Sequence, residues 1–246
     1  MCSSDLVIVG GKSNTGSAST SFIGGGELNE LRSGNGVLVG GRSNLVCANG
    51  NVTLVGGCLN IASGCCTFLG GGSRNKAEGQ QSVLVGGYNN TGSGNCSFIG
   101  GGSSNKICPN QSYSIIAGGL SNIVDDVCSF IGGGQGNCVA NSANGQGWAT
   151  IGGGQFNCTS CGGAAVVGGA QNDAFGCLSF IGGGFCNIVS EAKYGVIAGG
   201  CQNEITGSDT DGARSFIGSG AFNYISSNYS SIVGGTLNTA SGACSV

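Results

Sequence analysis

Short aliphatic runs, Gly pairs and a recurring Asn follow one another along the chain at a nearly constant interval. Each repeat reads aliphatic residue, two Gly, two variable positions and then Asn, and most successive Asn are 15 or 16 residues apart. A period this short is typical of a solenoid, in which each repeat forms one coil stacked on the previous coil. The fifteen recurring residues are Asn14, Asn29, Asn44, Asn60, Asn75, Asn90, Asn105, Asn122, Asn137, Asn157, Asn172, Asn187, Asn203, Asn223 and Asn238.

Positions within a repeat are numbered here from its Asn, which is position 0. Position −6 is Ile, Leu or Val in all fifteen repeats, from Ile8 to Ile232. A position that never turns polar is most simply a buried one, so we expect it to fill the interior of each coil. Position +2 is mostly small or aliphatic, as in Val46, Ala62 and Ile205, and we place it inside as well. Positions +1 and +3 mix Lys, Glu, Thr and Ser, and we expect them to face water.

Positions −7 and −5 lie on the opposite side of the same strand from position −6, because strand side chains alternate. Phe at −7 comes with Gly at −5, whereas Val or Ile at −7 comes with Val or Ala at −5. This balance of volume indicates close packing, so we expect both strand faces to be buried, the outer one against a second copy of the chain. The alternative, a lone solenoid with an exposed apolar stripe, would aggregate. The candidate subunit-interface residues are Phe22, Phe68, Phe98, Phe130, Phe180 and Phe216.

The Gly pairs occupy positions −4 and −3. Position −3 is Gly in every repeat, and position −4 is Gly in all but Ser219. Such glycines supply a positive φ or a close backbone approach at a sharp corner. The recurring Asn has two structural interpretations, a corner residue that tolerates a left-handed φ or a ladder of amides bonded from coil to coil.

Composition narrows the function classes. The net charge is −3 and 8% of residues are charged, so the chain offers no basic surface for nucleic acid. His is absent, which removes the commonest general base and metal ligand. Acidic residues are scattered, with Asp125 and Asp126 the one adjacent pair. We therefore expect no enzyme, no catalytic residue, no cofactor and no metal site, and no apolar run is long enough to span a membrane.

The chain has fifteen cysteines, an odd number. Candidate pairs from adjacent coils are Cys138 with Cys158, and Cys186 with Cys201. The one CxxC, formed by Cys158 and Cys161, has neither a second pair nor a His, so it gives little support for zinc or redox chemistry. Most cysteines are expected to be small buried side chains, with a minority in disulfides. Successive cysteines at position +6 lie two or more coils apart, and each coil adds about 4.8 Å. This distance is beyond disulfide reach, so they cannot pair with one another. They are Cys66, Cys96, Cys128 and Cys244.

The repeat is unbroken, which indicates one β-solenoid domain over 1–246, and its closeness to both chain ends suggests a segment of a longer fibre or a stacking subunit. Two insertions, near 140–148 and 208–214, interrupt the period. Solenoid insertions form surface loops that often bind partners, although a tolerated loop is the simpler interpretation. The Asp-x-Asp-Gly sequence in the second insertion lacks the later ligands of a calcium loop. The candidate receptor-contact residues are Trp148, Asp209, Asp211 and Arg214.

Two segments illustrate a family resemblance. Residues 97–105 read SFIGGGSSN, and residues 60–72 read NIASGCCTFLGGG. They resemble the head repeats of trimeric autotransporter adhesins, and they are more similar still to related repeats in phage and viral tail-fibre proteins. The similarity covers essentially the whole chain. It implies left-handed parallel β-rolls that pack side by side as a homotrimer on a bacterial or virion surface.

The sequence thus predicts an all-β parallel β-solenoid of about 15 coils with 15–16 residues each. The leading hypothesis is a non-enzymatic fibre or adhesin shaft on a virion or cell surface, with its own copies and a host-surface glycan or protein as partners. The main alternative is a self-stacking extracellular filament. An ice-binding solenoid needs a regular Thr array, which position +1 lacks, and a polysaccharide-cleaving β-helix needs paired acids in a groove.

Overall fold

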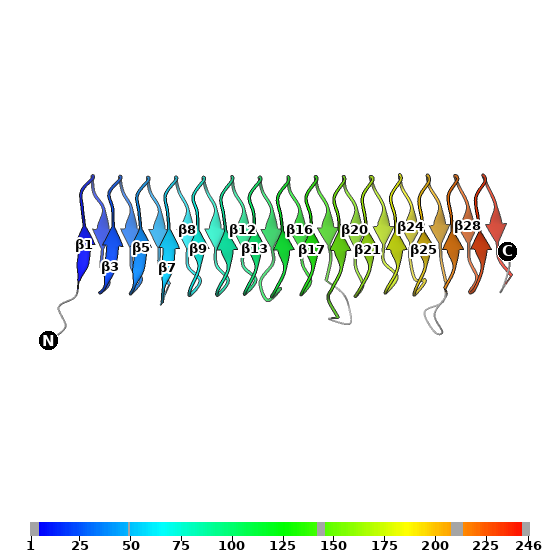
Figure 1. The fold of residues 1–246 in the computed structure, drawn as a ribbon, viewed down its shortest axis with the longest axis horizontal. Coiled ribbons are helices and arrows are strands. Elements are labelled where there is room, and N and C mark those ends of the chain that lie inside the picture. The colour runs from blue at the N-terminus through cyan, green and yellow to red at the C-terminus, as the bar shows by residue number, and fades with distance from the viewer. Residues whose placement is uncertain (1–4, 49, 142–145, 208–213, 243–246) are drawn as a thin grey trace. The chain divides into compact units, whose positions relative to one another are not determined.

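The chain is a parallel β-solenoid of about fifteen coils, in which each coil contributes one short strand to each of two sheets (Figure 1). This computed structural model describes residues 5–48, 50–141, 146–207 and 214–242, and no helix occurs among them. The all-β solenoid expected from the repeat is therefore confirmed. The chain divides into two compact units, Met1–Ser121 and Asn122–Val246. Strands with odd numbers form the odd-strand sheet of each unit, and strands with even numbers form its even-strand sheet.

In the first unit, neighbouring strands of each sheet come from consecutive coils and run parallel. The odd-strand sheet contains β1 (Leu6–Ile8), β3 (Ser21–Ile23), β5 (Gly36–Leu38), β7 (Val52–Leu54), β9 (Phe68–Leu69), β11 (Val83–Leu84), β13 (Phe98–Ile99) and β15 (Ile115–Ile116). The even-strand sheet contains β2 (Thr15–Gly16), β4 (Glu30–Leu31), β6 (Leu45–Val46), β8 (Ile61–Ala62), β10 (Lys76–Ala77), β12 (Thr91–Gly92) and β14 (Lys106–Ile107).

The second unit repeats this arrangement. Its odd-strand sheet contains β17 (Phe130–Ile131), β19 (Thr150–Ile151), β21 (Ala165–Val166), β23 (Phe180–Ile181), β25 (Val196–Ile197), β27 (Phe216–Ile217) and β29 (Ser231–Ile232). Its even-strand sheet contains β16 (Ile123–Val124), β18 (Cys138–Val139), β20 (Cys158–Thr159), β22 (Asp173–Ala174), β24 (Ile188–Val189), β26 (Glu204–Ile205), β28 (Tyr224–Ile225) and β30 (Thr239–Ala240).

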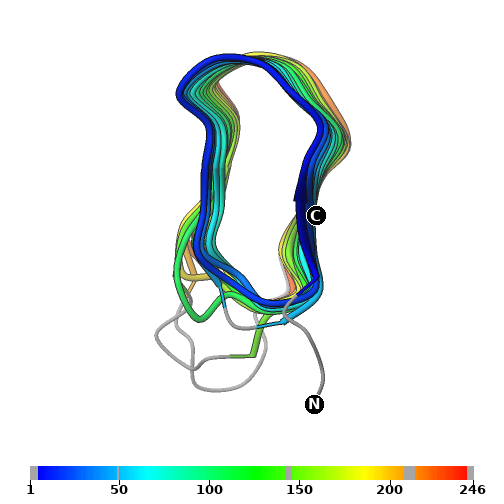
Figure 2. The same cartoon turned by 90° about the vertical axis from the view of Figure 1, so that its left-hand side faces the viewer.

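The interior of each coil is narrow and apolar. Seen along the stack, a coil is a flattened ring whose two long sides face each other (Figure 2). Position −6 from one side and position +2 from the other fill the ring, and Leu38, Val46 and Ile205 are fully buried. Both positions were expected inside, and the structure confirms this for nearly every coil. Ile8 is 41% exposed, because it lies in the first coil and has a described neighbouring coil on one side only.

Backbone torsions show why the corners need glycine at position −3. All fifteen of these glycines have φ between +81° and +102°. A Cβ atom there would also collide with the next coil, as at Gly87, where it would lie 2.2 Å from the Gly102 carbonyl oxygen. Position −3 therefore needs glycine for both reasons given in the sequence argument, positive φ and close backbone approach.

A second left-handed residue stands at position −1 of every coil. These residues include bulky side chains such as Leu28, Phe156 and Phe222, with φ between +53° and +57°. The recurring Asn at position 0 is absent from the left-handed region, so the corner interpretation of that Asn is wrong. The left-handed turn belongs to the residue before it.

Small hydroxyl side chains line the coil at position −8, which sequence reasoning overlooked. Ser82 and Ser97 are buried, and their hydroxyls donate to the carbonyls of Gly79 (2.8 Å) and Gly94 (2.7 Å) in the preceding turn. The recurrence of Ser, Thr, Ala and Gly at this position was the available signal. These bonds satisfy turn carbonyls that would otherwise be buried without a partner.

Candidate interaction surfaces

A continuous ladder of asparagine side chains runs through each unit, from Asn14 to Asn105 and from Asn122 to Asn238. The Asn90 Nδ2 donates to the carbonyls of Gly86 and Gly102, both at 3.0 Å, and its Oδ1 accepts from the Asn105 backbone N–H at 2.9 Å. The same three contacts recur along the ladder, and the interior members are almost fully buried. Each amide thus bonds its own corner to the next coil, a structural role.

The outer face of the odd-strand sheet is apolar along both units. It consists of positions −7 and −5, which carry Val, Ile, Phe, Ala, Gly, Thr and Ser but no charged residue in any coil. Six phenylalanines stand at position −7 and are each 37–38% exposed in the single chain: Phe22, Phe68, Phe98, Phe130, Phe180 and Phe216. Val39 and Val85 at position −5 are still more open, at 48% and 47%.

The pairing of Phe with Gly has a cause inside the chain. A Cβ atom on Gly100 would lie 2.3 Å from the Ala117 carbonyl oxygen of the next coil and 3.3 Å from the Phe98 ring. The other five Phe coils show the same geometry, so the ring covers the glycine of its own strand. The covariation therefore has an explanation within one chain, and burial of this face against a second copy stays a prediction. The apolar, uncharged character of the face is a separate observation that this contact does not explain.

The outer face of the even-strand sheet differs in character. Position +1 there carries Glu30, Lys76, Lys106, Asp173 and Glu204 among its fifteen residues. Neighbouring coils also pair charges at the adjacent corner, where Glu27 lies 3.5 Å from Lys12 and 3.7 Å from Arg42. These exposed ion pairs contribute little stability, but they mark a surface suited to water.

Only some residues of the two insertions lie within the described ranges. Trp148 has φ +62° and is 67% exposed, and its backbone N–H donates to the Val127 carbonyl at 3.1 Å. Arg214 stacks on the Tyr194 ring at 5.6 Å from its centroid, and Lys193 lies 5.5 Å from the same ring. The candidate residues Asp209 and Asp211 lie outside the described residues.

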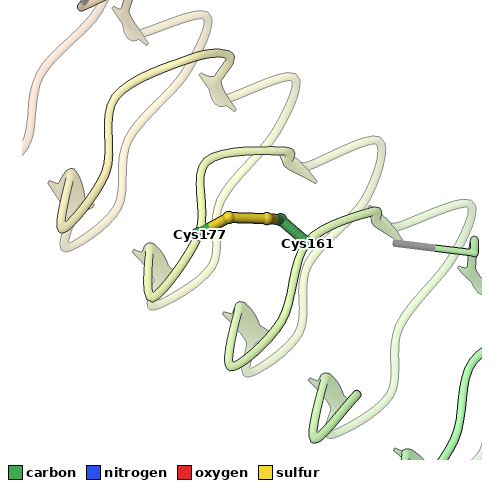
Figure 3. Close-up of a disulfide and its surroundings, with 2 residues drawn as sticks. All are labelled: Cys161 and Cys177. Atoms are coloured by element: carbon green, nitrogen blue, oxygen red, sulfur yellow. A yellow bond between two sulfur atoms is a disulfide. The ribbon is translucent and has the colours of Figure 1, made fainter. Parts of the chain in front are cut away.

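One disulfide joins consecutive coils of the second unit. Cys161 and Cys177 are bonded, with their Cα atoms 4.7 Å apart and a sequence separation of 16 (Figure 3). Sequence reasoning missed this pair, whose members stand at the different repeat positions +4 and +5. The bond links the corresponding turns of two consecutive coils.

The remaining described cysteines are not in disulfides, and none of them is buried. The expectation of small buried cysteines is therefore wrong. The interior positions −6 and +2 carry no Cys, and described cysteines stand instead at outward or corner positions such as +1, +3 and +6. Cys186 and Cys201 are not bonded, and Cys201 pairs across the coils with Phe185 rather than with Cys186.

Two hollows lie on the second unit, and neither resembles a catalytic centre. One, of about 480 Å³, is lined by uncharged residues of 231–242. The other, of about 310 Å³, is lined by residues that include Cys186 and Glu204. The Cys186 thiol donates a hydrogen bond to Gln171 Oε1 at 3.1 Å. No group of three or more Cys, Asp or Glu side chains suited to a metal ion occurs in the described ranges.

The described part of the chain also contains no helix of the length and apolarity needed to cross a membrane. No protein-family model matches the sequence, and no curated protein matches it significantly.

Proposed function

We propose that the protein is a non-enzymatic fibre or adhesin shaft, displayed on a virion or cell surface, whose columns associate side by side as a homotrimer. The observation that carries the proposal is the outer face of the odd-strand sheet. Its two positions in every coil lack charge, and half-open Phe rings recur along it. Apolar patches much larger than a few hundred Å² are rare on monomeric proteins and mark interaction sites.

The contrast between the two sheets supports a partner for one of them. Both sheets are parallel and bury one side of each strand, yet of the two outer sheet faces only that of the even-strand sheet carries charged residues. A second copy of the chain offers a face of the same composition and the same coil spacing. Side-by-side columns of equal pitch therefore keep their apolar side chains in register along their length.

Two isoleucines provide a matched test of this face. Ile115 on the odd-strand sheet and Ile123 on the even-strand sheet are each 39% exposed. We expect Ile115→Glu to convert the oligomer to monomers, because it places a charge in the desolvated centre of the proposed interface. We expect Ile123→Glu to leave the native mass unchanged. Light scattering coupled to size exclusion measures both, and equal masses for the two variants would contradict the proposed interface.

The residues beside the insertions are the proposed contact with a host-surface glycan or protein. The exposed Trp148 ring and the Arg214–Tyr194 stack are groups that commonly anchor such contacts. We expect Trp148→Ala to reduce adhesion to host cells without changing the melting temperature. Unchanged adhesion would remove Trp148 from the contact and leave the shaft proposal intact.

A further inference from the structure

Two free cysteines face each other on the even-strand sheet of the second unit. Cys138 in β18 and Cys158 in β20 are Cα partners in the parallel register. The strands are tightly bonded at this point, with Cys138 N–H donating to the Asn157 carbonyl at 2.9 Å. The next residues, Val139 and Thr159, are fully buried, so both cysteine side chains point to the outer face.

The two thiols stand side by side on this face, because their residues are in register. The Cys158 side chain lowers the pKa of Cys138, and the Cys138 side chain in turn raises the pKa of Cys158. Both residues are partly exposed, so a small reagent can reach them. In-register parallel strands lie about 4.8 Å apart, a spacing that falls within the Cα separation of disulfides.

The other thiol contacts among the described residues do not offer this geometry. Cys65 and Cys66 have their sulfurs 3.3 Å apart but are sequence neighbours, so a bond between them would join no coils. Cys186 and Cys201 are offset by one position, since Cys201 pairs with Phe185. Cys138 and Cys158 are the free cysteines described at one repeat position in consecutive coils.

We propose that Cys138 and Cys158 form a redox-active dithiol, which a low-molecular-weight disulfide such as oxidised glutathione converts to a second disulfide between coils. The Cys138 thiolate attacks one glutathione sulfur and displaces the first glutathione thiolate. The Cys158 thiolate then attacks the Cys138 sulfur of this mixed disulfide and displaces the second. The two protein thiols together lose two protons and two electrons, and one glutathione disulfide becomes two glutathione thiols.

The bond would enclose the first insertion in a covalent loop, because residues 140–148 lie between the two cysteines. Together with the Cys161–Cys177 bond it would tie three consecutive coils, those of Asn137, Asn157 and Asn172. The oxidised pair would hold residues 138–158 in one covalent loop, which the reduced pair does not form. Oxidation thus sets how firmly the proposed Trp148 contact region is held.

The test equilibrates the full chain in glutathione redox buffers, quenches it with a maleimide and maps peptides by mass. We expect a Cys138–Cys158 cross-linked peptide, two fewer alkylated thiols and a mass loss of about 2 Da, in buffers that leave Cys186 and Cys201 alkylated. The Cys138→Ser variant should leave Cys158 alkylated. Circular dichroism verifies that the fold is retained.

Several outcomes would overturn the proposal. They are full alkylation of both cysteines in the most oxidising buffer, separate glutathione adducts on each, or a bond from Cys158 to Cys161 instead. A Cys186–Cys201 disulfide that forms in the same buffers as the Cys138–Cys158 disulfide would also overturn it. That result would show general thiol oxidation rather than a property of the in-register pair. None of these results bears on the apolar face, so the shaft proposal is tested separately.

Discussion

Replacing Gly87 with Ala is expected to destabilise the solenoid strongly, whereas the same change at the neighbouring Gly86 is not. Gly87 has φ +93°, a conformation that costs an L-residue about 1–2 kcal/mol. The new methyl group would lie 2.2 Å from the Gly102 carbonyl oxygen and 2.6 Å from Asn90 Nδ2. The corner must open to admit it.

Opening the corner breaks two bonds to the Gly102 carbonyl, from Asn90 Nδ2 at 3.0 Å and from the Tyr88 N–H at 2.9 Å. Each is worth about 1 kcal/mol, so the total loss for Gly87→Ala is about 4 kcal/mol. Gly86 lies outside the left-handed region, and its added methyl would find its nearest atoms at 3.9 Å. We expect Gly86→Ala to change stability by less than about 1 kcal/mol, in the stabilising direction.

Urea unfolding followed by circular dichroism measures both variants at equal protein concentration. A difference of about 4 kcal/mol in the free energy of unfolding between the two variants corresponds to roughly 10 °C in melting temperature for a chain of this size. Equal destabilisation by the two substitutions, or none by Gly87→Ala, would refute the steric explanation of the Gly pairs.

Three further predictions concern single side chains. Asn90→Ala removes three hydrogen bonds made by a fully buried side chain and should cost about 3 kcal/mol in urea unfolding. Its control Asn51→Ala changes an exposed residue outside the left-handed region and should be near neutral. Cys161→Ser removes the inter-coil disulfide and should lower stability by about 3 kcal/mol, and a reducing agent should then have little further effect on the unfolding midpoint. Burial raises the pKa of Asp173 above its unfolded value, so its contribution favours folding at acid pH and is lost as pH rises through the folded pKa. Asp173→Asn should therefore flatten the acid side of the stability profile, and an unchanged profile would contradict the assignment.

The repeat pattern was sufficient to predict the solenoid and its interior. Position −6 never turns polar, and a strand with period two must then send −7 and −5 to the other side. This rule places the Phe98 ring on the outer face, where the structure finds it half exposed. The same rule places Cys138 and Cys158 on an outer face at position +1, although their small size suggested burial.

Other features leave no trace in a repeat alignment. The left-handed turn at position −1 holds Leu28, Phe156 and Phe222, which local preference would exclude, because the ladder bonds on either side fix the backbone whatever the side chain. The Cys161–Cys177 bond joins positions +4 and +5, a shift that depends on how one turn lies over the next. The need for Gly100 beside the Phe98 ring could be predicted only from the position of the Ala117 carbonyl in the next coil.

The native mass of the wild-type chain at micromolar concentration, with electron micrographs of the same sample, tests the central claim most directly. A chain whose uncharged outer face is covered by its own copies should give three times the chain mass, in rods wider than a single column. Isolated single columns of one chain mass, soluble with the Phe22, Phe68 and Phe98 rings open to water, would contradict it.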